Sequence, residues 1–316
     1  MNRSALIFGL IILPLSLLAQ QHPAGLQMDD AAYERIPLQK TPEGARMASR
    51  ASLKQFAPLA EDQGNYNNCV GWAVAYGART IMFAQEKGIR DKRLIQQYAF
   101  SPAFTYKLIS RSRSCNEAVS IEAALSSMAQ QGAALQRQVP ESCVNRLYSR
   151  DYSDARQYKI GGYSRLFYRD ARSNEKIQSV KYALASGQPV IVGMNCTPSF
   201  ETAENQNVWR RTESLNTRNY YGHAVCVIAY DNDKYGGAFQ IMNSWGSSWG
   251  KSGFIWVKYQ DFAAFTKYGY APKSLQQSNR KKQAIPISQH SSPIRGFLPL
   301  LLLYYRPRRR LRLLNK

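Results

Sequence analysis

The sequence predicts an α+β fold, because helical patterns fill its first half and strand patterns fill its second half. Three early segments have the apolar spacing and the end signals of helices: 67–88, 100–110 and 120–132. Later segments combine Tyr- and Ile-rich alternation with short apolar runs and are expected to be strands: 157–168, 188–196, 223–231, 238–245 and 253–259. This separation of the two kinds of element favours two lobes within one unit.

The segment 67–88 predicts a helix that is buried on nearly every side. Asn67 or Asn68 can cap its start, apolar residues cover almost all of its faces through Ala84, and Gly88 can end it. We therefore expect this helix to lie inside the core.

The remaining helices have clearer boundary signals. Ser101 and Pro102 begin the segment 100–110, as expected for an N-cap followed by a first helical residue. Ser120 can cap the next helix and Gly132 can end it. Residues 174–187 predict one short helix between the strands, closed by a glycine.

Length and composition are those of a globular protein with a real core. The chain has 316 residues, of which 44% are hydrophobic and 20% are charged. Its net charge of +21 is unevenly spread, since residues 276–316 contain ten Lys or Arg and no acidic residue. A positive net charge of this kind could bind nucleic acid, an anionic membrane surface or acidic substrates. It could also belong to a basic protein with a charged tail and no such partner.

The N-terminus reads as a secretory signal over residues 1–20. Arg3 precedes an apolar run from Ala5 to Leu18, which is short for a bilayer span, and cleavage is expected near Ala19. An uncleaved anchor is the alternative. Either reading places the protein outside the cytoplasm, in a periplasmic, extracellular or cell-surface location where disulfides can form.

Residues 21–50 read as a short, loose leader before a domain at 51–275. The basic tail, 276–316, has an apolar stretch too short to span a bilayer, followed by an arginine cluster. It could bind an anionic membrane surface, act as a sorting signal or be disordered. Tyr304 and Tyr305 lie beside arginines, but an exported protein seldom meets nucleic acid, so that partner is disfavoured.

The cysteine and histidine counts narrow the chemistry. Five cysteines are widely spaced, with no pair at metal-ligand spacing, so we expect no metal and no cofactor. An odd number in an exported chain leaves at least one free thiol. Of three histidines only His223 lies in the globular part, so any imidazole base must be His223.

Cys69 is the natural free thiol. At the first turn of a helix it would face unpaired N–H groups and the positive end of the macrodipole, which favour the thiolate. The thiolate is the nucleophilic form. A buried cysteine that acts only as a small hydrophobe is the alternative reading.

Four motifs in this order resemble the papain family of cysteine peptidases. Gln63 and Gly64 precede Cys69 at the family's spacing, and Gly222-His223-Ala224-Val225 matches the strand that carries the base. Asn243-Ser244-Trp245-Gly246 and the run 249–255 match the segment of the orienting asparagine. The resemblance covers roughly residues 52–270. It implies a helical lobe with a central active-site helix and a lobe built on antiparallel sheet.

The resemblance also implies a role for each matching residue. Cys69 would attack the scissile carbonyl, His223 would pair with the thiolate and protonate the leaving amine, and Asn243 would orient His223. Gln63 would donate its amide to the oxyanion, beside the backbone N–H of Cys69. Trp245 would cover the Asn–His contact. No cofactor is implied.

The sequence departs from the family pattern near the nucleophile. Tyr66 replaces the cysteine that usually lies three residues before it, so the usual disulfide is missing, and Trp72 stands two residues later than usual. The leader is short for a folded inhibitory propeptide. Cys115 could bridge to Cys143. A second bridge could join Cys196 and Cys226, or Cys226 could be only a buried thiol.

The expected function is an exported peptidase with a Cys-His-Asn mechanism, acting on peptide or protein substrates. Two alternatives remain. One is an amidase or transpeptidase acting on cell-wall or isopeptide bonds, which would share the triad. The other is a binding module that keeps the fold without turnover.

Overall fold

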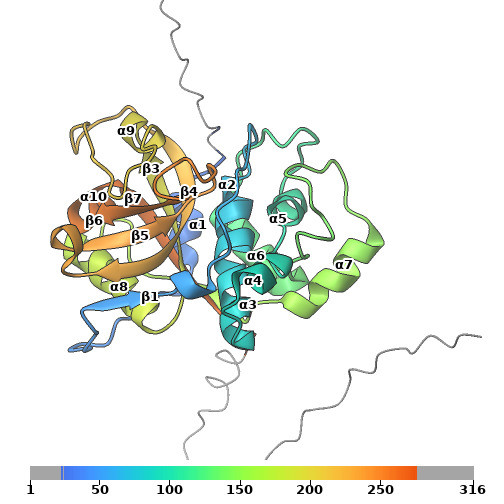
Figure 1. Ribbon diagram of the computed structural model, residues 1–316, viewed down its shortest axis with the longest axis horizontal. Helices are drawn as coiled ribbons and strands as arrows, with labels where there is room; N and C mark the ends of the chain where they lie inside the picture. The colour runs from blue at the N-terminus through green and yellow to red at the C-terminus, as the bar shows by residue number, and fades with distance from the viewer. Residues whose placement is uncertain (1–22, 24, 276–316) are drawn as a thin grey trace, which may run out of the picture.

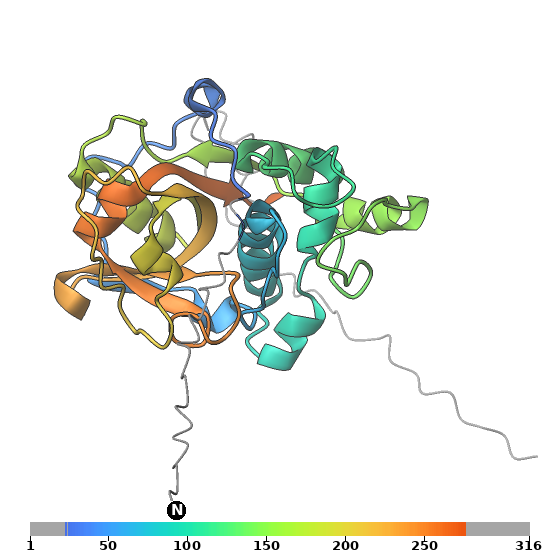
Figure 2. The ribbon, with the colours of Figure 1, turned by 90° about the horizontal axis from the view of Figure 1, so that it is seen from above.

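Two lobes lie side by side in the computed structural model, which describes residue 23 and residues 25–275 (Figure 1). One lobe consists of helices α2 to α7, and the other is built on a sheet with α1, α8, α9 and α10 around it. The helix that begins with α2 lies between them when the molecule is seen from above (Figure 2). The expected α+β architecture with two lobes is confirmed.

The helices predicted at 100–110 and 120–132 form with the predicted serine caps. The Ser101 hydroxyl accepts a hydrogen bond from the Phe104 N–H, and the Ser120 hydroxyl accepts one from the Ala123 N–H, each at 3.1 Å. The helices are α1 (Asp30–Arg35), η1 (Lys54–Phe56), α2 (Cys69–Gly71), η2 (Trp72–Arg79), α3 (Thr80–Lys87), α4 (Lys92–Gln97), α5 (Pro102–Ile109), α6 (Ile121–Gln131), α7 (Ser149–Ala155), η3 (Arg156–Tyr158), α8 (Ser173–Ala185), α9 (Pro198–Glu201), η4 (Lys234–Gly236) and α10 (Tyr259–Phe265).

The elements α2, η2 and α3 form one continuous helix whose middle, η2, is π-helical. Every residue from Cys69 to Ala84 is buried. A Cβ atom at Gly71 would lie 2.4 Å from the Pro102 carbonyl oxygen, and one at Gly77 would lie 3.0 Å from the Cβ of Cys226. The two glycines therefore allow this helix to approach α5 on one side and the sheet on the other.

The sheet is antiparallel throughout, with β1 paired to β4 beside the order β2-β7-β3-β4-β5-β6. The core-facing side chains of its central strands, such as Ile191, Val227 and Ile241, are fully buried. The strands are β1 (Arg50–Ser52), β2 (Gly162–Arg165), β3 (Val190–Cys196), β4 (Tyr221–Asp231), β5 (Ala238–Met242), β6 (Phe254–Lys258) and β7 (Thr266–Lys273).

The prediction of a loose leader is wrong for its first part, because Gly25, Leu26, Ala32, Tyr33 and Ile36 are buried against the domain. Asp29 caps the short helix α1, and Tyr33 within that helix is fully buried. The Tyr33 ring stacks on Tyr268 with 4.5 Å between centroids, and its hydroxyl donates to the Phe167 carbonyl at 2.8 Å. A buried aromatic anchor of this kind is easily overlooked in a polar segment.

One of the two suggested disulfides forms. Cys115 is bonded to Cys143. The suggested bridge between Cys196 and Cys226 is wrong, since both are free and buried. The antiparallel register of β3 and β4 explains this, because Cys196 faces Tyr221 while Cys226 faces Ile191, at the other end of the ladder.

The expected signal segment 1–20 and the basic tail 276–316 lie outside the described residues. Among the residues that are described, no helix combines the length and the apolar character that a bilayer crossing requires.

Replacing both Cys115 and Cys143 with Ala should lower the free energy of unfolding by about 2–4 kcal/mol, because the disulfide closes a loop with a sequence separation of 28. Urea denaturation followed by tryptophan fluorescence measures this loss. The control is the wild-type chain with and without reductant. An unchanged midpoint in the double variant would contradict a stabilising role for the bridge.

Candidate active site

Cys69 is the first residue of α2, and its thiol is free and fully buried. The preceding asparagine occupies the N-cap position but does not cap the helix with its side chain. Its Nδ2 instead donates to the Ser142 carbonyl at 2.6 Å, and the Asn67 N–H donates to the Cys115 carbonyl at 2.8 Å. The expected capping is therefore wrong. The polar turn is anchored to the two loops that the disulfide joins.

His223 lies on β4, Asn243 directly follows the neighbouring strand β5, and the two side chains contact each other. The distance from His223 Nε2 to Asn243 Oδ1 is 2.8 Å, and both side chains are buried. The backbone N–H of Ser244 also donates to Asn243 Oδ1, at 2.9 Å, which identifies this atom as the amide oxygen. An oxygen can only accept, so Nε2 carries the proton and Nδ1 is the ring nitrogen left for exchange with a thiol.

The thiol lies beside the strand that carries this histidine. The backbone of Ala224, the residue after His223, lies near enough to the Cys69 sulfur to favour its thiolate. The start of the central helix thus meets β4 at the histidine. The structure brings together three residues that are 154 and 20 positions apart along the chain.

Gln63 is fully buried with its amide held in one orientation. Its Oε1 accepts a hydrogen bond from the Ser244 hydroxyl at 2.7 Å, and its Nε2 donates to the Tyr66 carbonyl at 2.8 Å. An amide nitrogen has two hydrogens, so one remains for another acceptor. The sequence placed Ser244 within a motif but did not indicate that its hydroxyl fixes this amide.

Trp245 covers the histidine. Its ring stacks on His223 with 4.4 Å between centroids and 25° between planes, and it is 2% exposed. Phe200 and Trp249 pack edge-on against the same indole. This aromatic cluster keeps water away from the contact between His223 and Asn243.

Residues 25–28 of the leader run between the lobes, over the thiol. The Gly25 backbone lies near enough to the Cys69 sulfur to favour its thiolate. Its carbonyl accepts from the Val119 N–H, and the Gln27 N–H donates to the Val119 carbonyl, each at 3.0 Å. A Cβ at Gly25 would lie 2.2 Å from the Asn67 carbonyl oxygen, so only glycine fits there.

The next residue of the leader fills space on the sheet side. Leu26 is 8% exposed, and its Cδ2 would lie 3.0 Å from a Cβ at Gly193. Its carbonyl oxygen would lie 2.9 Å from a Cβ at Gly222, next to the catalytic-site histidine. Backbone pairing on one lobe and an apolar side chain on the other hold the leader in place.

Burial raises the pKa of the Cys69 thiol to about 11. Backbone contacts with Ala224, Gly25, Val70 and Cys69 itself act in the opposite direction but are smaller. This direction is opposite to the one expected from the helix N-terminus. Removal of water from a charged sulfur outweighs the helix field at this buried position.

The description "Papain family cysteine protease" belongs to the family model that matches residues 83–272, more than half of the chain. The chain belongs to the papain family of cysteine proteases. It is thus a cysteine peptidase by family. The matched segment contains the histidine and the asparagine but begins after Gln63 and Cys69, whose assignment depends on the motif and the geometry above.

Curated relatives match over shorter stretches. The uncharacterized peptidase C1-like protein L477 of Acanthamoeba polyphaga mimivirus is 34% identical over 116 residues, which cover 34% of this chain and 35% of that protein. Cysteine proteinase 3 of Entamoeba histolytica is 32% identical over 73 residues, 23% of each chain. The chain thus spans about a third or less of the length of these relatives.

Solved structures share the fold. Xylellain, a cysteine protease from Xylella fastidiosa, superposes with a TM-score of 0.62 at 21% identity, covering 80% of this chain and 96% of its own. Digestive procathepsin L2 from the Tenebrio molitor larval midgut gives 0.64 at 17% identity, covering 83% and 81%. At these identities the likeness establishes the papain-like two-lobe fold.

Displacing the leader should make Cys69 reactive at lower pH. A raised pKa means that the thiolate forms only as the pH approaches 11, so about one thiol in 10⁴ is ionised at pH 7 in the covered form. Gly25→Val would clash with Asn67 and lift the leader, so the midpoint of the alkylation rate against pH should move down.

Iodoacetamide labelling followed by peptide mass spectrometry measures this profile at Cys69 separately from the other thiols. Gln27→Ala is the matched control, because its side chain is exposed and its backbone bond to Val119 is kept. An identical profile for Gly25→Val and wild type would show that the leader does not control the thiol.

Proposed function

We propose that this chain hydrolyses peptide bonds through a thioester acyl-enzyme formed on Cys69, with His223 as base and acid and Asn243 as the residue that orients it. The observation that carries the proposal is the oriented contact between His223 Nε2 and Asn243 Oδ1. It leaves Nδ1 as the proton-exchanging nitrogen, on a strand that meets the Cys69 sulfur.

The proposed acylation step conserves protons and electrons. Nδ1 of His223 takes the thiol proton, and the Cys69 sulfur attacks the carbonyl carbon to form a tetrahedral oxyanion. The C–N bond then breaks, the imidazolium protonates the leaving amine, and a thioester remains. In deacylation His223 takes a proton from water, which attacks the thioester and returns the thiol.

The oxyanion would be held by two donors. One is the second Nε2 hydrogen of Gln63, whose amide is fixed by Ser244 and Tyr66. The other is the backbone N–H of Cys69 at the helix start, which is favoured by the positive end of the helix. Both donors are already oriented before a substrate binds.

The proposal includes latency, because a peptide substrate and the leader would compete for the same space. Gly25 lies against the sulfur and Leu26 fills the adjacent apolar position. Displacement or cleavage of residues 25–28 would expose the thiol and also remove the burial that raises its pKa. Peptide or protein chains are the proposed substrates.

Export remains part of the proposal. The N-terminal segment has the proportions of a signal, and the Cys115–Cys143 disulfide fits an oxidising compartment. We further propose that the arginine-rich tail contacts an anionic membrane surface. Its charge pattern supports this, although the tail lies outside the described residues.

Variants of the three catalytic-site residues test the proposed mechanism. Cys69→Ala should abolish hydrolysis of a peptide library by the leader-free enzyme. His223→Ala should lower kcat by about 10²–10⁴-fold, and Asn243→Ala should lower it less, because it removes orientation and not the base. Full activity in His223→Ala would refute the assignment.

An epoxide-type thiol inhibitor separates the alternatives in the same samples. Stoichiometric labelling at Cys69, lost in His223→Ala, supports an activated thiol. Labelling without peptide cleavage but with cleavage of isopeptide or cell-wall amide bonds would replace the peptidase with an amidase or transpeptidase. No labelling after leader removal would leave a binding module.

Ser244→Ala should lower kcat up to about tenfold with little change in KM, because the Gln63 amide loses one of the two bonds that orient it. Steady-state kinetics on the best peptide substrate measures this split. Ser199→Ala, in the same lobe but bonded to Glu213, is the control. A change in KM alone would contradict a positioning role.

A further inference from the structure

A cavity of about 330 Å³ lies on the outer face of strands β5 and β6, away from the residues of the triad. Gln240 and Trp256 are register partners on this face, whereas their neighbours Ile241 and Ile255 are fully buried on the opposite face. Other chain segments complete the walls, contributing Lys54, Asn207, Lys234, Lys251 and Phe254.

The lining is strongly positive. It contains three lysines, and no carboxylate is found among its described lining residues. Lys54 Nζ lies 4.7 Å from the centre of the Phe254 ring, and Lys234 Nζ lies 4.7 Å from the centre of the Trp256 ring. The aromatic faces thus hold two ammonium groups at the cavity without neutralising them.

These ammonium groups repel each other. Burial lowers the pKa of Lys54, and the charge of Lys234 lowers it further. Neither lysine forms an ion pair with any carboxylate in the described part of the chain. An anion in the cavity would attract both ammonium groups and offset the repulsion between them.

Gln240 contributes an amide to the cavity wall. Its side chain is only 7% exposed. The amide nitrogen can donate to an anion, as the lysine ammonium groups can. Its position in the cavity wall places it beside the lysines.

We infer that this cavity binds a tetrahedral oxyanion carrying two negative charges, a phosphate or sulfate group. Three lysines and two residues with side-chain amides, Gln240 and Asn207, line the cavity from different segments of the chain. A carboxylate offers two oxygens and one charge, whereas a tetrahedral dianion offers acceptors in all of these directions. The volume leaves room for bound water or for the group that carries the anion.

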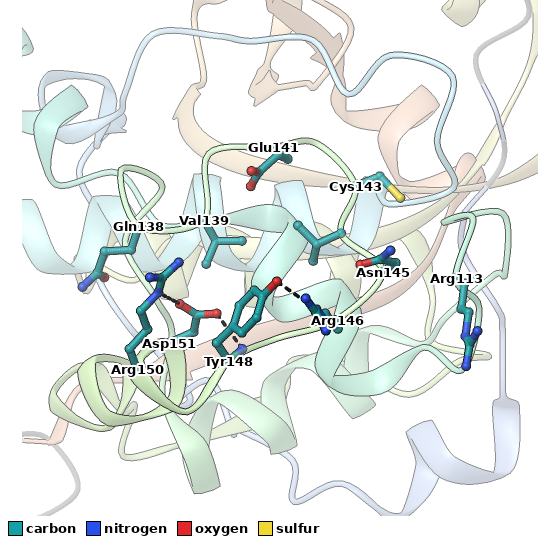
Figure 3. A pocket seen from close by; sticks show the side chains of 11 residues that line it. Arg113, Gln138, Val139, Glu141, Cys143, Asn145, Arg146, Tyr148, Arg150 and Asp151 are labelled. Atoms are coloured by element: carbon teal, nitrogen blue, oxygen red, sulfur yellow. Dashed lines mark hydrogen bonds and ion pairs between the residues drawn. The ribbon is translucent and has the colours of Figure 1, made fainter.

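A second basic cavity, of about 390 Å³, shows the contrast (Figure 3). Two of its three arginines already have partners in the chain. Arg146 Nε donates to the Tyr148 hydroxyl at 2.8 Å, and Arg150 Nε lies 3.7 Å from an Asp151 carboxylate oxygen. Glu141 also lines that cavity, so its positive charge is largely compensated.

A bound anion would link parts of the chain that are far apart in sequence. Lys54 comes from η1, Lys234 from η4 between β4 and β5, and Lys251 from the loop before β6. Strand β5 is followed directly by Asn243. The anion should therefore stabilise the sheet lobe near the strand that carries Asn243.

Thermal unfolding of the full chain in inorganic phosphate, compared with chloride and acetate at matched ionic strength, tests the inference. Phosphate and sulfate should each raise Tm by about 2–4 °C when present well above Kd. Isothermal titration with phosphate should give one site. Tighter binding of O-phosphoserine would point to a phosphate ester, and tighter binding of inorganic phosphate would point to the free ion.

Variants separate a built site from general screening, and all of them keep the basic tail. Lys54→Gln and Lys234→Gln should each weaken phosphate binding at least about fivefold, whereas Lys40→Gln removes the same charge from an exposed position elsewhere and should have no effect. Gln240→Leu should keep or raise Tm in chloride but lose the phosphate effect.

Two results would overturn the inference. One is an equal rise of Tm in phosphate, chloride and acetate. The other is a phosphate effect on Tm that Lys40→Gln reduces as much as Lys54→Gln does. Either result would mean that phosphate screens surface charge without binding a specific site.

Discussion

The active site depends on the close contact between the central helix and strand β4. Gly77 lets the helix approach the Cβ of Cys226, and this approach sets the start of the helix, with Cys69, against the strand that carries His223. A side chain at Gly77 would push the helix outward and separate the thiol from its base. The same packing buries the helix on all sides, which accounts for the absence of charge along it before Arg79.

Ser244 connects the two halves of the site by three hydrogen bonds. Its N–H orients Asn243, its hydroxyl orients the Gln63 amide, and its carbonyl accepts from the Gln63 N–H at 2.8 Å. The proposed oxyanion donor, Gln63, and the proposed orienting residue, Asn243, are thus both held by Ser244. If Ser244 shifts, the Gln63 and Asn243 side chains shift with it, so their positions relative to each other are kept.

Under the proposed latency, the leader would act on the thiol in two ways. It would exclude substrate from the cleft, and it would contribute to the burial that raises the pKa of Cys69. The leader is held by backbone pairing at Val119 and by the anchor of α1 on the sheet, where Tyr33 is fully buried.

The sequence by itself determined the local elements and pointed to the residues of the site. Serine caps, terminal glycines and apolar periodicity are short-range signals, and they predicted the helices at α5 and α6 and the strands β3 to β6. Motif spacing singled out Gln63, Cys69, His223 and Asn243.

Only the tertiary structure decided how segments far apart meet. It set the strand order that places β7 between β2 and β3, and the register that keeps Cys196 and Cys226 apart. It also set the hydrogen bond from the Asn68 amide to Ser142, which replaces capping of its helix. The direction of the Cys69 pKa shift was also decided only by the tertiary structure. The helix N-terminus is a local feature that the sequence reveals, whereas desolvation depends on everything packed around the sulfur, including a leader more than forty residues away.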